Sequence, residues 1–582
     1  MVSLVSLGVA LATVPGFIDA IPNVSFRKAS VNSTNSTATN STAGLSRVGV
    51  LQKAGVHELN YNNDARLASK QFYELLSDAN NTYYDEKNGI LGTTFFSENV
   101  YSRQPFVANG YIGSRITNVG LGFALDTSTV AGNRTAEALE NTWPEYNRRY
   151  AGSFVSDFYA LEPHLTKTNF PEIDEKGYPS IIASLPDWTD LQFLVTNSSN
   201  WFNALNVTAD QVTNYSQNMS MENGIVTTAM DWLDGQFHVR SQIIAHREVN
   251  PVGIVTLDIE LNVDKLPANF TDVTLEFFDI FNHSTSVRTF LQNSGFDSKN
   301  NGIFMVVQPD NVPYNNAALF STAEIEVMAN DGSIIGNNSF AASPVNLTDG
   351  YSAQSATVTL TKTNTMVHIK KFVGVMSSTY SMNNSTNLDV AAEYATDCRD
   401  GNFTQTLLSH NQAWEDLYNG AKIEIPSDSL LELTARSSMY QLLANSRPNN
   451  VSLERGLQMT VGGLSSDSYA GYVFWDADMW VAPAMLPFAP KVAKNINSYR
   501  NATHHQALLN AKEYGYKGAL YPWTSDGFSN CSSTGPCVDY EYHINIDVAF
   551  STLTIFLSGA TSDLNEEYLR YTTWPIVKDA AE

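Results

Sequence analysis

Cysteine, basic residues and long apolar runs are all scarce in this 582-residue sequence, which has only three cysteines. So few cysteines exclude a disulfide-rich scaffold, which means that side-chain packing must hold the fold together. Cys531 and Cys537 enclose a turn of Ser, Thr, Gly and Pro, so we expect them to close a small disulfide-bonded loop in an oxidising compartment. Cys398 then has no evident partner.

The sequence also lacks metal-binding spacings. Its three cysteines and ten histidines form no CxxC, HxxxH or HExxH pattern, so we expect neither a metal site nor a metal cofactor. Basic side chains number 34 against 59 acidic ones, which gives a formal net charge of -25. Such a balance argues against nucleic acid or an anionic lipid surface as partner and favours a neutral small molecule.

The amino-terminal apolar stretch, Val2–Val14, is too short to cross a bilayer. A small-residue pattern at Ile18–Ala20 follows it, so we predict a signal peptide over residues 1–20, with a buried strand or part of a membrane anchor as the alternative. Residues 21–55 contain the tract NSTNSTATNST, which cannot bury apolar surface and predicts a flexible, glycosylated arm. No later segment predicts a transmembrane helix.

Asn-x-Ser/Thr sequons occur about twenty times. Together with the signal-like start they predict passage through the secretory pathway, so the protein would be secreted, held in the cell wall or periplasm, or delivered to a vacuolar lumen. Each glycosylated Asn must lie on the surface. The residues expected to carry glycans are Asn133, Asn197, Asn206, Asn282, Asn346 and Asn501.

Residues 56–385 consist of short runs rich in Val, Ile, Thr and Phe separated by turn residues, which predicts an antiparallel β-sandwich domain. The clearest strands are 225–233 and 237–245, joined across Asp234 and Gly235 in a tight hairpin. A third strand, 252–263, alternates apolar and polar residues. Further strands are expected at 356–360 and 366–374.

Helical periodicity takes over near residue 387. We expect a helical linker over 386–427 and an all-helical region over 428–582. One helix is predicted to start with Ser429 and Glu432 in capping-box spacing. Further helices, joined by aromatic and Gly-rich loops, are predicted at 482–499, 501–514, 547–557 and 565–578.

Gly462–Trp480 places charge among aromatic rings. A sugar site needs a ring platform and carboxylates that accept hydrogen bonds from hydroxyls, and Trp475 beside Asp476 offers both. The alternative is a buried Trp/Asp pair that only joins two helices. Loops 518–527 and 541–547 are expected to share the pocket, although His543 could instead be a core histidine and Asp547 a helix N-cap.

Three segments in this order resemble the fungal acid trehalases, whose wider relatives include maltose and kojibiose phosphorylases: YVFWDADMW at 472–480, ALYPW at 519–523 and HINIDVA at 543–549. Upstream, NGYIGSR at 109–115 is similar to a segment that opens the family's sandwich domain. The resemblance implies an amino-terminal β-sandwich, a helical linker and an (α/α)6 barrel, of which 428–582 would be the first part. It also implies hydrolysis of α,α-trehalose to glucose with inversion at acidic pH, without metal or organic cofactor.

The resemblance assigns roles to individual residues. Trp475 and Asp476 match the pair that holds the non-reducing glucose, and Asp478 stands where relatives carry a second acid. The other residues that it implies in the substrate pocket are Trp523, His543 and Asp547.

These motifs lack a general acid for the leaving oxygen. In the family this acid is a Glu beyond the HINxD motif, so we expect it beyond Glu582. The chain would then be truncated and its own activity doubtful. Glu541 in YEYH is the remaining candidate for the acid. One alternative function is a disaccharide phosphorylase, which uses phosphate in place of water. Another is a non-catalytic cell-surface protein that binds glycans through the aromatic pocket.

Overall fold

A computed structural model of the chain describes residues 57–58, 81–125, 150–161, 180–342, 350–377, 386–448, 457–525, 527, 529 and 541–582. The predicted signal peptide, the arm over 21–55, the Cys531–Cys537 pair and the sequons at Asn133 and Asn346 lie outside the described residues. Of the other predicted glycosylation sites, Asn197, Asn206 and Asn501 are exposed and Asn282 is half-buried.

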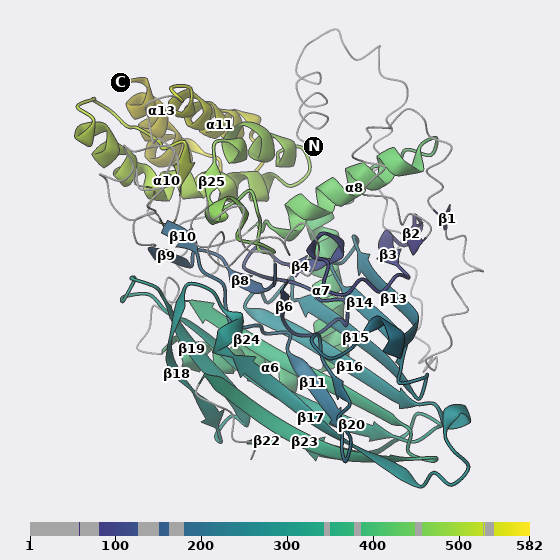
Figure 1. Cartoon of the computed structure of the whole chain (residues 1–582). Helices are drawn as coiled ribbons and strands as arrows, with labels where there is room; N and C mark the ends of the chain where they lie inside the picture. Colours follow the sequence, from purple (N-terminus) through teal and green to yellow (C-terminus); the bar gives the residue numbers. More distant parts are fainter. Residues whose placement is uncertain are drawn as a thin grey trace.

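The amino-terminal part is a large antiparallel β-domain, shown in Figure 1 below the helices. Its larger sheet has 12 strands, which in spatial order are β1 (His57–Glu58), β2 (Thr82–Asp85), β3 (Ile90–Thr93), β13 (Val212–Ser220), β14 (Val226–Trp232), β15 (Phe237–Ala245), β16 (Val252–Leu261), β24 (Met366–Ser377), β20 (Ala317–Met328), β19 (Gly302–Pro309) and β18 (Thr289–Asp297), with β21 (Ile334–Ser339) beside β20. The second sheet has 5 strands: β12 (Trp201–Phe202), β11 (Leu191–Val195), β17 (Asp272–Asn282), β23 (Tyr351–Thr361) and β22 (Ala341–Ala342).

Short strands complete the β-domain. They form a sheet of β4 (Phe106–Ala108), β5 (Ile112–Arg115) and β8 (Ser153–Val155), and the pairs β6 (Ala124–Leu125) with β7 (Tyr150–Ala151) and β9 (Tyr159–Leu161) with β10 (Ser180–Ile182). The predicted hairpin is confirmed, because β14 pairs with β15 and Asp234 and Gly235 both adopt positive φ in the turn between them. The strands expected at 252–263, 356–360 and 366–374 correspond to β16, β23 and β24.

The two larger sheets pack face to face around one hydrophobic core. Phe193 of β11 stacks on Phe202 and meets Trp232 of β14 edge to face, with ring centroids 5.4 Å apart in the second pair. A fully buried ion pair also crosses the core, since Lys371 Nζ of β24 lies 2.8 Å from Asp279 Oδ1 of β17. Apolar burial therefore holds the sheets together, and the charge buried between them is paired.

Two helices follow the β-domain, α6 (Asn387–Asp400) and α7 (Phe403–Tyr418). Helix α6 lies against β24 and β20, and its close approach depends on Gly374, where a Cβ atom would stand only 1.9 Å from the carbonyl oxygen of Ala391. Cys398 of α6 is buried and has a free thiol.

Helix α8 (Ser429–Ala444) begins one residue earlier than a cap at Ser429 would place it. Its N-cap is Asp428, whose side chain accepts a hydrogen bond from Leu431 N at 3.0 Å, so the expected capping box of Ser429 and Glu432 is wrong. Glu432 is instead buried and ion-paired with Arg436. A carboxylate at the preceding position caps as well as a serine does, and spacing alone could not separate the two.

The remaining helices are α9 (Ala482–Met485), α10 (Pro490–Glu513), α11 (Ile544–Ser558), α12 (Glu566–Tyr568) and α13 (Trp574–Ala581). The helices predicted at 482–499 and 501–514 are wrong in their division, because α10 runs continuously across residue 500. The helical break lies instead before Pro490, which occupies the first turn of α10, where its missing N–H costs no hydrogen bond. No helix in the described part of the chain is long and apolar enough to cross a membrane.

Candidate active site

The three loops singled out in the sequence lie next to one another in the helical region. Residues Val473–Phe474 form β25, which pairs with β26 (Thr524–Ser525), so the first two loops lie side by side. The chain then enters a π-helical turn, Ala477–Val481, that leads into α9. The third loop ends at His543, immediately before α11, and belongs to the same cluster of packed rings.

Aromatic rings connect the loops. The Trp475 indole meets the His543 ring edge to face, with centroids 4.8 Å apart, and lies 6.0 Å from the Trp480 ring. Trp523 meets Phe474 edge to face at 5.9 Å. Trp475 and Trp523 are both only half-buried. Tyr472 belongs to the core instead, because its ring is buried and its hydroxyl donates to the carbonyl of Ser180.

His543 stands between two carboxylates. Its Nδ1 lies 2.5 Å from Asp547 Oδ2 and its Nε2 lies 2.6 Å from Glu541 Oε2. The hydrogen bond to Asp547 is the main cause that raises the pKa of His543. The core-histidine alternative is wrong because 44% of the side chain is exposed. The N-cap alternative for Asp547 is also wrong, since α11 begins at Ile544 and Asp547 lies within its first turn.

Asp478 is a buried member of the motif. Its Oδ2 accepts hydrogen bonds from Arg500 Nη2 at 2.7 Å and Nε at 3.0 Å, and Arg500 also donates to Ser525 Oγ at 3.1 Å. Burial raises the pKa of Asp478, although the guanidinium opposes this effect. Asp478 is therefore the residue whose buried carboxylate joins two helical elements. The sequence had suggested that role for Asp476.

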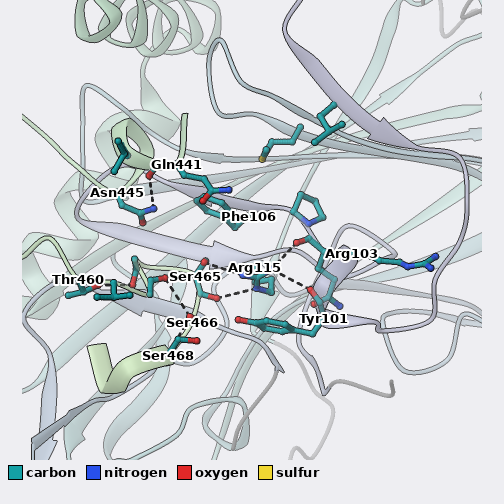
Figure 2. Close-up of a pocket in the computed structure, with 18 of the residues that line it drawn as sticks. Tyr101, Arg103, Phe106, Arg115, Gln441, Asn445, Thr460, Ser465, Ser466 and Ser468 are labelled. Atoms are coloured by element: carbon teal, nitrogen blue, oxygen red, sulfur yellow. Dashed lines mark hydrogen bonds between the residues drawn. The ribbon is translucent and has the colours of Figure 1, made fainter. Parts of the chain in front are cut away.

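Asp476 has a different environment from its neighbours. Its carboxyl group is half-buried, and burial, followed by the charge of Asp478, raises its pKa. It lines a cavity of about 840 Å³ between the β-domain and the helical region. We call this the interface cavity; part of its lining is drawn in Figure 2. Of the predicted site residues, Asp476 alone lines it, while Trp475, Trp523, His543 and Asp547 form the adjoining cluster.

The NGYIGSR segment joins the two parts of the molecule beside this cavity. Gly110 and Gly113 permit close contact, because Cβ atoms there would lie 2.6 Å from the carbonyl oxygen of Ser446 and 2.5 Å from that of Leu464. Arg115 then donates from Nε and Nη2 to Ser465, both at 3.2 Å. Figure 2 shows these hydrogen bonds from Arg115 across the domain boundary.

The motifs of the sequence do not indicate the part that the β-domain plays in this cavity. Arg115 Nη1 donates to the carbonyl of Gln104 at 2.9 Å, and its guanidinium lies 4.0 Å from the centroid of the Tyr101 ring. These contacts fix the turn that carries Tyr101 and Arg103 to the cavity wall. The available signal was Arg115 itself, a basic residue at the end of a motif whose glycines mark close backbone contacts.

Two family models match the chain. The description of the first is glycosyl hydrolase family 65, N-terminal domain, and it covers residues 91–417. The second is the glycosyl hydrolase family 65 central catalytic domain, which covers residues 436–571. The chain belongs to glycosyl hydrolase family 65. The first match ends within the last turn of α7, and the second begins within α8.

Curated relatives match across both parts of this family 65 chain. It is 54% identical over 532 residues to the periplasmic acid trehalase of Saccharomyces cerevisiae, an alignment that covers 91% of this chain and 43% of the relative. It is 38% identical over 523 residues to the cell wall acid trehalase of Candida albicans, covering 88% of this chain and 46% of the relative. The chain thus spans less than half the length of these relatives.

The fold is also shared with a solved structure described as a kojibiose phosphorylase from the human microbiome. The TM-score is 0.64 at 12% identity, and the match covers 86% of this chain and 60% of that chain. At this identity the likeness concerns the fold, which is a large β-domain followed by helices.

Proposed function

We propose that this chain supplies the substrate-holding part of an acid trehalase, which hydrolyses α,α-trehalose to two glucose molecules with inversion. The observation that carries the proposal is the 54% identity over 532 residues to a periplasmic acid trehalase. The geometry supports it, because Asp476 presents a half-buried carboxylate to the interface cavity, and Trp475, its neighbour in the sequence, lies in the adjoining cluster of rings. Carboxylates accept paired hydrogen bonds from sugar hydroxyls, and indole rings cover apolar sugar faces.

The other motif residues take two kinds of role in this proposal. Trp475, Trp523 and His543 provide rings near the glucose, and Asp547 orients His543 through their hydrogen bond. Asp478 supports the site through Arg500, because a carboxylate with this degree of burial cannot meet a substrate without opening the fold.

An inverting hydrolase requires two carboxyl groups about 6.5 to 9.5 Å apart, one as acid and one as base. Glu541 is a poor candidate for the acid because its Oε2 is already engaged by His543 Nε2 at 2.6 Å. We propose instead that the general acid is a glutamate in the part of a full-length acid trehalase that this chain does not match, as the resemblance to that family implies.

The helical region is proposed to be part of an (α/α)6 barrel, within the division 56–385, 386–427 and 428–582 given by the sequence. Helix α11 supports this, because one of its faces is buried while the opposite face exposes apolar residues at helical spacing, namely Ile546, Phe550, Leu553 and Leu557. A helix in a barrel of paired helices has apolar neighbours on both faces, which would cover such a stripe.

A secreted, cell-wall or periplasmic location is proposed on two grounds. The relatives are named for such locations, and three of the predicted glycosylation sites are exposed in the described part of the chain. Glycopeptide mass spectrometry after expression in yeast should find glycans at Asn197, Asn206 and Asn501. Unmodified asparagine at all three would contradict the proposed location.

The decisive test is glucose release from trehalose in acidic buffer without phosphate. It compares the 582-residue chain with a protein of the relatives' length that contains it. The longer protein should release glucose, Asp476→Ala should abolish release, and Asp331→Ala, at an exposed turn of the β-domain, should leave it unchanged. A strict requirement for added phosphate would instead identify a phosphorylase, and no release under either condition would favour a non-catalytic glycan-binding protein.

A further inference from the structure

The interface cavity has one wall from each part of the molecule. The β-domain contributes Tyr101 and Asn218, and the helical region contributes Gln441, Tyr469 and Asp476. The lining thus combines aromatic rings with amides and hydroxyls, which is the combination that neutral sugars require. Its volume of about 840 Å³ lies within the range of about 300 to 1,000 Å³ typical of small-molecule sites.

The charges of the lining also favour a neutral ligand. Asp476 is the only carboxylate among the described residues of the lining, and Arg103 and Arg115 are its only cations. The Arg115 guanidinium is directed to protein oxygens, with hydrogen bonds to Ser465 and to the carbonyl of Gln104. An anion would therefore meet Arg103 as its main attraction and Asp476 as an opposing charge.

We propose that the interface cavity is a saccharide-binding subsite continuous with Asp476, and that the β-domain takes part in substrate recognition through Tyr101 and Asn218. The inference rests on the proposed function and extends it, because it gives a binding role to a wall outside the helical catalytic region. Asp476 holds one sugar unit, and the β-domain residues of the lining contact the next unit or the entering disaccharide.

The position of Asn218 offers a way to fill the cavity. Asn218 lies half-buried on β13 and lines the cavity, whereas Thr213 lies exposed on the same strand outside it. Asn218→Trp would place an indole in the space proposed for the sugar. Thr213→Trp adds the same group to the same strand at a site that faces solvent, so it is the matched control.

The first experiment measures trehalose binding to the 582-residue chain by calorimetry, with thermal unfolding as the check on folding. Asn218→Trp should weaken binding at least about tenfold, while Thr213→Trp should bind as the unmodified chain does. Asn218 also begins the sequon Asn218-Met219-Ser220. Ser220→Ala removes that sequon without filling the cavity and should bind normally. A glycan found on Asn218 of the native protein would occupy the subsite and overturn the inference.

A second experiment removes a ring instead of adding one. Tyr101→Ala should weaken trehalose binding about tenfold, since it deletes an aromatic face from the cavity. Tyr314→Ala is the control, because Tyr314 is exposed on the β-domain and does not line the cavity. In the longer protein the same Tyr101→Ala change should raise KM and leave kcat nearly unchanged, a division that general unfolding would not produce.

The outcomes separate the two proposals. If Asp476→Ala abolishes glucose release by the longer protein while Asn218→Trp and Tyr101→Ala bind trehalose normally, the β-domain subsite is wrong and the trehalase proposal stands. If the longer protein releases no glucose, the proposed function fails. In that case, if Asn218→Trp still weakens trehalose binding, the proposal that the cavity binds a saccharide stands. If the folded chain binds no trehalose, that proposal is wrong as well.

Discussion

Replacing Asp478 by Ala should strongly destabilise the helical region. The ion pair of Asp478 and Arg500 is almost completely buried, with side-chain exposures of 1% and 2%. Without the carboxylate, the Arg500 guanidinium keeps the hydrogen bond to Ser525 Oγ but loses both of its hydrogen bonds to Asp478 Oδ2. Removing one partner of a buried pair costs about 3 to 5 kcal/mol because the other charge stays buried without compensation.

The assay is denaturant unfolding followed by tryptophan fluorescence, since Trp475 and Trp480 lie close to the pair in sequence and report on this region. The control is Glu566→Ala, which breaks the exposed pair with Arg570 and should change stability by less than about 0.5 kcal/mol. The double change Asp478→Leu with Arg500→Met should recover much of the loss, because apolar replacements leave no buried charge. If Asp478→Ala cost no more than Glu566→Ala, the structural role assigned to the pair would be refuted.

Two further predictions concern the β-domain. Burial raises the pKa of Asp187 to about 6 and of Asp190 to about 7, near Lys371 and Asp279. Because folding raises these pKa values, protonation of the two carboxyl groups stabilises the folded state. This contribution to the free energy of unfolding is complete below the unfolded pKa of about 3.9 and is lost as the pH rises through about 6 to 7. Denaturant midpoints should therefore be higher in mild acid, and Asp190→Asn should reduce this pH dependence. Gly374→Ala should lower the free energy of unfolding by about 1 to 3 kcal/mol, because the new Cβ would meet Ala391 O at 1.9 Å. The control is Gly336→Ala, which has open space around the new Cβ and should have little effect in the same unfolding assay.

The strands of the β-domain could be predicted because burial follows the sequence directly. Alternate residues of β14 are buried, which is the period of 2 that the sequence displays. The helical breaks were harder. The apolar spacing near residue 500 predicts two helices, although Pro490, the first residue of α10, marks the break more reliably than small changes in that spacing do.

The candidate site could be found from the sequence only in part. The clustering of Trp475, Trp523 and His543 follows from motifs that are rich in rings, and the structure places these residues together. The different environments of Asp476 and Asp478 could not be predicted, because the partner of Asp478 lies on α10, 22 residues further along the chain. The interface cavity was equally out of reach, since its walls come from segments near residues 100, 218, 441 and 460 that only tertiary packing brings together.

The contacts of the NGYIGSR segment explain how two parts of the chain can form one cavity. Its glycines let the β-domain backbone approach the carbonyls of Ser446 and Leu464, and Arg115 then bonds to Ser465. Ser465 lies 11 residues before Asp476, in the loop that leads into β25. Because one guanidinium holds both this loop and the turn of Tyr101, the spacing of the two walls is set by the same contacts that join the domains. A helical region separated from the β-domain would keep the rings around Trp475 but would lose the lining residues that the β-domain contributes.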